Sequence, residues 1–263
     1  MHRISVLVKK EWYEVFKHRS VLLTVLLVPL IMTAIPLAIL FSMRADMGVI
    51  EASAEMPGQM TAFCPANLSS GECFQVFLVS QFMIMFMLLP LSIPSTIAAY
   101  SITGEKTTRS LEPLLATPIT TVQLLVGKGL AAVLPAALAT YLAFGAFALG
   151  AWLLVPNRDV LRAMLDARWL LAVFLVGPLL AVLSVTFSLM VSSRANDPRV
   201  AEQISAVIIV PVLAVFFGQI AGLFVLNSRL VLLIGLALVL IDALMVYMAV
   251  QLFQRETILT RWK

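Results

Sequence analysis

The residues that most often carry catalytic or metal chemistry are scarce in this chain. Its two histidines, His2 and His18, lie roughly four helical turns apart near the N-terminus, so they cannot share a metal ion. Without a further histidine, no Ser-His-Asp or Cys-His constellation can form. The segments around Lys106 and Lys128 lack either the first glycine or the Ser/Thr of a phosphate-binding loop. We therefore expect no catalytic residue, no metal site and no nucleotide site in this chain.

Asp242 is the one acidic residue that falls inside a long apolar run, at 230–252. An aspartate at the centre of a spanning helix costs about 2.5–3.5 kcal/mol to insert, and the many Leu, Ile and Val residues around it outweigh that cost. We expect Asp242 to face protein or water rather than lipid. Two roles are open for it: coupling of an ion or a proton, and a structural hydrogen bond between helices.

Cys64 and Cys73 are the only cysteines, and turn-forming residues lie between them. Because both fall in a segment that we predict to lie outside the cell, we expect a disulfide between them. Closing so short a loop would stabilise the fold by about 2–3 kcal/mol on the chain-entropy model. The alternative is a pair of unpaired thiols.

Long apolar runs are the elements that must position these residues. Hydrophobic residues make up 61% of the 263 residues and charged residues only 12%, whereas ordinary globular domains carry about 25% charged residues. A helix of about 20 apolar residues crosses the hydrocarbon layer, and the runs here are continuous, unlike the alternating strands of a β-barrel. The sequence predicts an all-α integral membrane protein, a single domain over 1–263, with six transmembrane helices at about 21–43, 76–100, 129–154, 169–192, 204–226 and 230–252.

The basic residues set the orientation of these spans. With the N-terminus inside, 13 of the 18 Lys and Arg residues lie on the inner side and 5 on the outer side. We therefore expect a plasma-membrane protein with both termini in the cytoplasm. The longest outer loop is then 44–75, and the longest inner loop is 101–121, followed by 193–203. The net charge of +4 needs no nucleic-acid partner, because no basic patch with interleaved aromatic residues is present.

Residues 2–19 predict an N-terminal amphipathic helix before the first span. One face is apolar and includes Trp12, while the opposite face is charged, and helices of this kind lie in the membrane interface. A plain cytoplasmic helix is the alternative. The first 43 residues lack a cleavage site of the kind that signal peptides carry, so we expect them to be retained. The apolar face consists of Ile4, Leu7, Val8, Trp12, Val15 and Phe16.

The inner loop 101–121 carries the most informative pattern. A short cytoplasmic helix is predicted there, capped by Ser110 and ended by Pro118, and Thr120 with Gln123 forms a capping box for the third span. One face of the short helix is an apolar ridge rimmed by charged residues. Such a helix either docks into the groove of a partner protein or lies flat on the membrane surface. The ridge consists of Leu111, Leu114 and Leu115.

The string from Glu105 to Pro118 closely resembles the coupling-loop motif of ABC-2 type permeases, which is roughly E-K-x-x-G-T-L-E-x-L-L-x-T-P. Arg109 stands where the family commonly has glycine and Ser110 where threonine is common, while the leucine ridge is kept. The opening K-K-E-W at 9–12 is similar to the family's elbow helix at the membrane surface. Length, six spans and inner termini also match, so the resemblance covers essentially the whole chain.

The resemblance implies a transmembrane subunit of an ABC exporter. Such subunits act as a pair, a homodimer or a heterodimer, with two separate ATPase subunits that hold ATP and Mg²⁺; the chain itself would bind no cofactor and would not be an enzyme. The ridge would dock onto the ATPase, oriented by rim charge pairs that are each worth little. The elbow helix and the inner segment 193–203 would add contacts. The implied coupling residues are Glu105, Lys106, Arg109, Leu111, Glu112, Leu114, Leu115, Thr117 and Pro118.

Two other functions remain open at this point. A secondary transporter or channel that uses Asp242 would move its substrate on a proton or sodium gradient without ATP. A membrane sensor subunit would bind a partner without transport. The substrate cannot be read from the sequence, and drugs, sodium, lipids and peptides all remain open.

Overall fold

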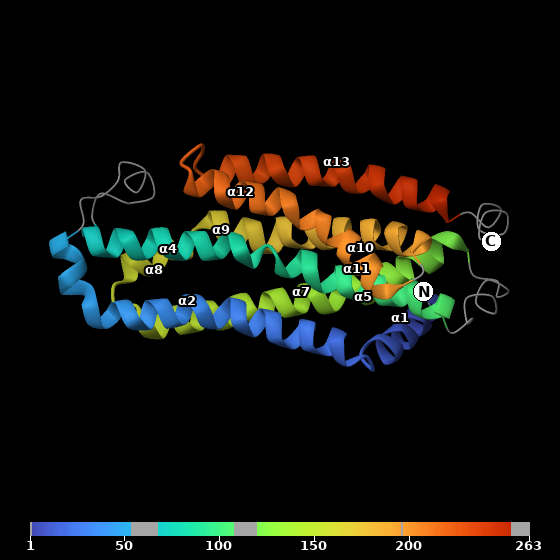
Figure 1. The fold of residues 1–263 in the computed structure, drawn as a ribbon. Coiled ribbons are helices and arrows are strands. Elements are labelled where there is room, and N and C mark those ends of the chain that lie inside the picture. Colours follow the sequence, from blue (N-terminus) through green and yellow to red (C-terminus); the bar gives the residue numbers. More distant parts are fainter. Residues whose placement is uncertain (1, 54–67, 108–119, 196, 254–263) are drawn as a thin grey trace.

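The structure is a computed structural model that describes residues 2–53, 68–107, 120–195 and 197–253. These residues form an elongated bundle of helices, and no strand occurs among them (Figure 1). In chain order the elements are α1 (His2–Val15), α2 (Arg19–Ser53), α4 (Ser70–Phe86), α5 (Leu89–Thr107), α7 (Thr121–Leu154), α8 (Arg158–Met164), α9 (Ala167–Leu171), the π-helix η1 (Ala172–Val176), α10 (Gly177–Arg194), α11 (Pro198–Ser205), the 3₁₀-helix η2 (Ala206–Ile209), α12 (Val210–Ile220) and α13 (Ser228–Leu252).

Six helical segments of the described residues are long and apolar enough to cross a membrane. They confirm the prediction of an all-α membrane protein with six spanning helices. The segments are Val21–Met43, Ser70–Glu105, Thr121–Leu154, Arg158–Arg194, Pro198–Ile220 and Ser228–Leu252.

Three of these segments are interrupted helices. In each of them, the helix that follows the interruption has a proline in its first turn. The second span breaks after α4, the fourth contains η1, and the fifth contains η2. In each case a proline is the second residue of the helix that follows: Pro90 in α5, Pro178 in α10 and Pro211 in α12. Proline lacks an N–H and crowds the preceding turn, so the hydrogen-bond pattern changes there while the early position in the new helix remains favourable.

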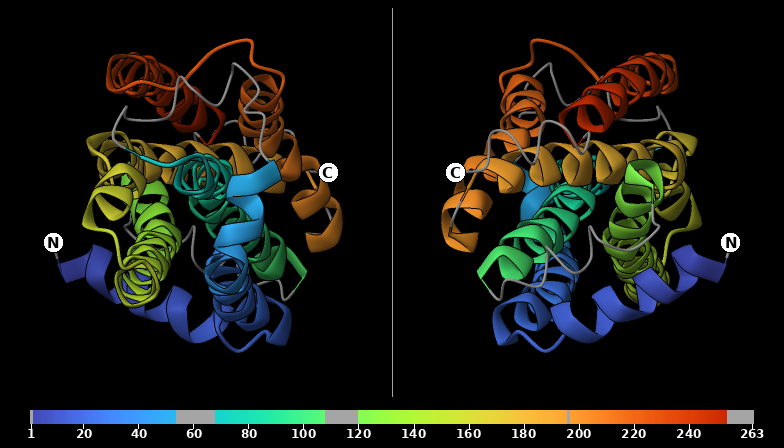
Figure 2. Two further views of the ribbon diagram at one scale, coloured as in Figure 1. Left: turned by 90° about the vertical axis from the view of Figure 1, so that its left-hand side faces the viewer. Right: turned by 90° about the vertical axis from the view of Figure 1, so that its right-hand side faces the viewer.

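The second span forms the centre of the bundle. Of its most apolar window 67% is buried, against 11% for the fifth span, which leaves the fifth span to face lipid or another chain. α5 packs against α10, α7, α11 and α2. Seen along the bundle, α12 and α13 lie on one side of α10, and α1 and α2 lie on the other (Figure 2).

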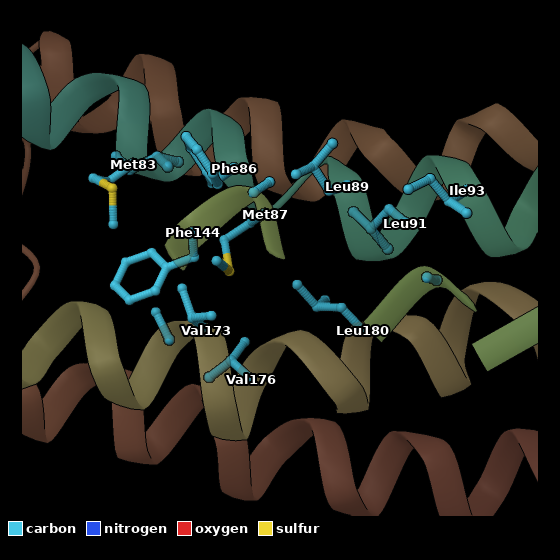
Figure 3. Close-up of a cluster of buried hydrophobic side chains, with 14 of the residues drawn as sticks. Met83, Phe86, Met87, Leu89, Leu91, Ile93, Phe144, Val173, Val176 and Leu180 are labelled. Carbon is cyan, nitrogen blue, oxygen red and sulfur yellow. The ribbon is translucent and has the colours of Figure 1, made fainter. Parts of the chain in front are cut away.

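Part of the buried core lies where α4 gives way to α5. There, side chains of the second span meet side chains of α7 and of the fourth span (Figure 3). Phe86 is fully buried, and its ring centroid lies 6.0 Å from that of Phe147 in α7. The cluster includes Met83, Phe86, Met87, Leu89, Leu91, Ile93, Phe144, Val173, Val176 and Leu180.

The two ends of the bundle differ in the elements they gather. One end, called here the α1 end, holds α1, the end of α5, the start of α7 and the end of α13 (Figure 1). The opposite end, the α8 end, holds α8 and the start of α4. At the α1 end, the predicted capping box of α7 is confirmed: the N–H groups of Thr120 and Gln123 each donate to the other residue's side chain over 3.2 Å.

Helix ends differ from the predicted span ends in several places, and two of them change the length of a loop. The fifth predicted span ran to residue 226, but α12 ends at Ile220, because the chain turns at Gly222 with a φ of 71° and Asn227 caps α13. The predicted outer loop began at residue 44, but α2 continues to Ser53. Hydropathy marks where a helix leaves an apolar environment, and a helix can continue beyond that point.

Candidate functional site

The predicted coupling segment falls largely outside the described residues. Arg109, Leu111, Glu112, Leu114, Leu115, Thr117 and Pro118 lie there, so the leucine ridge stays a prediction. The structure describes the helices on both sides of the segment. α5 leads into it and carries Glu105, and α7 leads out of it and carries Lys128.

Glu105 and Lys128 belong to a buried ion cluster, which we define as Lys10, Glu11, Ser101, Glu105 and Lys128. The ammonium group of Lys128 lies 2.7 Å from Glu11 Oε1 and 2.9 Å from Glu105 Oε2. The ammonium group of Lys10 lies 2.7 Å from Glu105 Oε1. The cluster therefore joins three elements that are far apart in sequence: α1, the end of α5 and the start of α7.

Ser101 completes the cluster from α5. Its hydroxyl donates to Glu11 Oε2 over 2.6 Å and accepts a hydrogen bond from Lys128 Nζ over 2.8 Å. Glu11, Glu105 and Lys128 are each no more than 3% exposed. Buried charges are stable only when they are paired and hydrogen-bonded, and removal of one partner leaves the others uncompensated. The cluster thus holds α1, α5 and α7 together, and substitution of any one of its charged residues should be destabilising.

The charges within the cluster balance. Two carboxylates, Glu11 and Glu105, face two ammonium groups, Lys10 and Lys128. Burial by itself would lower the pKa of Lys10, but its hydrogen bond to Glu105 and the nearby carboxylates raise that pKa above the ordinary value. Oxygens of Glu11, Glu14 and Glu105 lie close enough together to hold a metal ion. The lysine ammonium groups already occupy that position, so these residues suit an ion cluster rather than a metal site.

Apolar packing also fastens α1 to α7. Leu7 is 4% exposed and fills the space above Gly127, where an added Cβ would collide with the leucine Cδ2 atom. One turn further on, the indole N–H of Trp12 donates to the carbonyl of Ala131 over 2.8 Å. That carbonyl has no helical partner because the residue four positions on is Pro135, which has no N–H. Trp12 therefore donates to the Ala131 carbonyl the hydrogen bond that an N–H at position 135 would otherwise supply.

Two expectations from the sequence need correction here. The apolar face of α1 was expected to enter the membrane interface, but Leu7, Val8 and Val15 are buried within the protein. Glu105 was expected to form charge pairs on an exposed rim, but it is buried and its ion pairs are internal. The role of Glu105 in coupling to an ATPase stays a prediction, as does that of Lys106, whose side chain lies outside the described part.

Lys128 is a functional candidate that no sequence motif identifies, because its segment resembles only an incomplete phosphate-binding loop. A signal was present: Lys128 is the only charged residue between Glu112 and Arg158, and an ionisable group in an apolar stretch requires a partner. The glycine on its N-terminal side, which admits Leu7, was a second signal.

The second inner segment lies beside α5. Asp197 caps α11, its carboxylate accepting the N–H of Arg199 over 2.7 Å. The hydroxyl of Thr96 in α5 donates to Glu202 Oε1 over 2.7 Å. On α10, the buried hydroxyl of Ser192 donates to the carbonyl of Ala99 over 3.1 Å. α5 is thus fastened on several sides at the α1 end.

The remaining predicted residues lie away from the cluster. Asp242 is 6% exposed in α13, and neither of its carboxyl oxygens has a hydrogen-bond partner among the described residues. Cys73 is buried near the start of α4 and is disulfide-bonded, whereas Cys64, the only other cysteine of the sequence, lies outside the described residues, so the pairing of Cys64 with Cys73 stays a prediction.

Comparison with known families identifies the family to which this chain belongs. Residues 5–252 match the family model described as ABC-2 family transporter protein. No curated protein matched the chain significantly. The family match begins within α1 and ends at the last residue of α13, so it takes in the ion cluster and all six spanning segments. The chain therefore belongs to the ABC-2 family of transporter proteins.

Proposed function

We propose that this chain is the permease subunit of an ABC exporter, and that ATP hydrolysis on separate ATPase subunits drives its transport. Family membership supports a permease role within an ABC transporter. Two ATPase subunits and a second permease chain would complete the assembly, with ATP and Mg²⁺ on the ATPase subunits. The α1 end would face the cytoplasm of a cell, in its plasma membrane.

The observation that carries this proposal is the ion pair between Glu105 and Lys128. Glu105 is the first residue of the segment that resembles a coupling motif, Lys128 follows the segment in α7, and their charged groups lie 2.9 Å apart. Both are tied to α1 through Lys10 and Glu11. A movement of the segment would therefore carry α5, α7 and α1 together rather than bend a single helix.

Hydrogen bonds between α5 and α10 would transmit that movement to the fourth span. α5 is bonded to α10 not only near Ala99 but also near its own start, where the buried hydroxyl of Ser184 donates to the carbonyl of Leu91 over 2.6 Å. Buried side-chain to backbone bonds of this kind resist sliding of one helix along the other. A displacement of α5 would thus reach the fourth span, and through its packing the sixth.

Docking can be tested by charge substitution on the predicted ridge. Leu114→Asp combined with Leu115→Asp should abolish co-purification of the partner ATPase while membrane insertion continues, because aspartate cannot occupy an apolar groove. Leu223→Asp is the matched control, since Leu223 is 78% exposed in the turn between α12 and α13, away from the α1 end. Normal ATPase binding and ATP-driven transport in the double variant would refute the proposal.

The same assay separates the exporter from an ion-coupled transporter. In proteoliposomes that contain the complete complex, transport should require ATP and should stop when the catalytic site of the ATPase is inactivated. Transport by the purified chain alone on a proton or sodium gradient would instead favour the ion-coupled function.

A further inference from the structure

An apolar cavity lies between the second, fourth, fifth and sixth spans. Its volume is about 200 Å³, and its walls come from α4, α9, η1, α10, α12 and α13. Met87, Val176 and Leu180, which line it, are visible in Figure 3. Apolar cavities of about 150 Å³ are already large enough to bind a small aromatic molecule. The cavity can therefore hold the apolar part of a ligand.

Three buried polar side chains without hydrogen-bond partners among the described residues lie in the lining of this cavity or one helical turn from it. Trp169 lines it directly, and its indole N–H has no hydrogen-bond acceptor among the described residues. Gln219 is one turn beyond the lining residue Val215 in α12, and both its amide atoms are without partners. Asp242 is one turn beyond the lining residue Leu238 in α13.

Gln219 and Asp242 are not lining residues, but helix geometry directs each side chain toward a turn that lines the cavity. Side chains in a helix lean toward its N-terminus and cover the preceding turn. Gln219 therefore leans toward the turn that carries Val215, and Asp242 toward the turn that carries Leu238. Buried polar groups are almost always hydrogen-bonded, and an exception calls for a ligand or another explanation.

Asp242 has no opposite charge among the described residues that could neutralise it. The elements packed against α13 are α10, α9, η1 and α7. Of their basic groups, Lys128 pairs within the ion cluster and Arg194 is exposed at the end of α10. Arg168 is a lining residue of the cavity, but its guanidinium group pairs with Asp166 over 2.6 Å and donates to the carbonyl of Leu226 over 3.2 Å. An ionised carboxylate in such a place needs a cation.

We propose that this cavity binds an amphiphilic organic cation, with its apolar body in the cavity and its charge beside Asp242. Trp169 and Gln219 supply one N–H donor and one amide for polar groups of the ligand. A metal ion does not suit the site, because Ca²⁺ and similar ions require six or more oxygen ligands. Nor does the headgroup of a membrane lipid, because Asp242 lies near the middle of α13, roughly 3 Å along the helix from its central residue.

This inference rests on the proposed function only in treating the ligand as a transport substrate, and binding is measured without the ATPase. The probe is radiolabelled benzyltrimethylammonium, added to the full chain in lipid nanodiscs, with empty nanodiscs subtracted. Neopentylbenzene, which has the same shape without the charge, serves as the competing neutral compound. We expect saturable binding of the cation and at least tenfold weaker competition by neopentylbenzene, since a close charge pair contributes at least a factor of about ten.

Two variants locate the binding. Asp242→Asn should weaken binding of the cation at least tenfold, whereas Asp159→Asn, which removes the same charge from an exposed position in α8, should not. Val215→Phe should reduce binding by filling the cavity while Asp242 stays in place, so the assay still decides if the asparagine variant does not fold. An absence of saturable binding, or equal binding by wild type and both cavity variants, would overturn the inference. Binding of the ATPase should be unchanged in all of them, so a failed docking proposal would be recognised separately.

Discussion

The ion cluster at the α1 end and the polar groups near the inner cavity are both buried, but they differ in whether their polar groups have partners. In the ion cluster every charged group has a partner within 3 Å, and the partners come from three separate elements. Around the cavity, Trp169, Gln219 and Asp242 have none among the described residues. A fully paired cluster fixes the relative positions of helices. Unpaired groups beside a cavity leave room for a molecule that is not part of the chain.

Removal of Lys128 should produce the largest effect on stability. Lys128→Met leaves Glu11 and Glu105 buried with one ammonium group instead of two, and breaking a buried ion pair in this way costs about 3–5 kcal/mol. The measurement is the free energy of unfolding in mixed micelles. Arg162→Met is the control, because its ion pair with Asp159 is exposed and should contribute little. A cost no greater than that of the control would mean that the cluster does not hold the helices together.

Packing between α1 and α7 should give the next largest effect. Gly127→Ala places a methyl group against Leu7 and should destabilise the protein by about 1–3 kcal/mol, the usual cost of overpacking. Leu7→Ala itself should cost about 2–5 kcal/mol, but in that background Gly127→Ala should cost little more, because the space is already open. Additive losses in the double variant would show that α1 does not dock at Gly127.

The hydrogen bond of Trp12 should have a smaller effect that depends on Pro135. Trp12→Phe leaves the Ala131 carbonyl without a donor and should cost about 1 kcal/mol beyond the loss of side-chain volume. In a Pro135→Ala background the helix supplies its own N–H to that carbonyl, so the hydrogen-bond part of the cost should disappear. A double-mutant cycle of unfolding free energies gives this coupling. A coupling energy of zero would contradict the role assigned to Trp12.

Asp242 should show the smallest loss of stability, or none. Asp242→Asn replaces a buried carboxyl group that has no hydrogen-bond partner among the described residues, so the unfolding free energy without ligand should stay the same or rise. This result would sharpen the contrast with Lys128, since both residues are buried and ionisable. A loss comparable to that of Lys128→Met would instead reveal a structural partner for Asp242.

The sequence was sufficient for features that depend on neighbours along the chain. Continuous apolar runs predicted six spanning helices, and Thr120 with Gln123 predicted the start of α7, because hydropathy and capping are local properties. The pairing of Glu11 with Lys128 spans 117 positions, and no local pattern specifies it. The amphipathic pattern of α1 was also ambiguous. It shows that one face avoids water, but it does not distinguish lipid from the side of α7.

The cavity could not be predicted from the sequence either, because it too depends on contacts between distant segments. Sequence indicated that Asp242 must avoid lipid, but not whether a neighbouring helix would supply a partner. Its surroundings depend on how the interrupted second, fourth and fifth spans pack together, and the π-helix and 3₁₀ segments in those spans shift the faces that meet.

The central claim is that the ion cluster makes α1 and α7 move as one body with the coupling segment. The direct test is a pulsed EPR distance between spin labels at the exposed residues Tyr13 in α1 and Val122 in α7, with Cys64 and Cys73 replaced by serine. We predict one narrow distance that is the same with and without ATP in the complete complex, and a broad distribution in Lys128→Met. A wild-type distance that changes when ATP binds would contradict the claim.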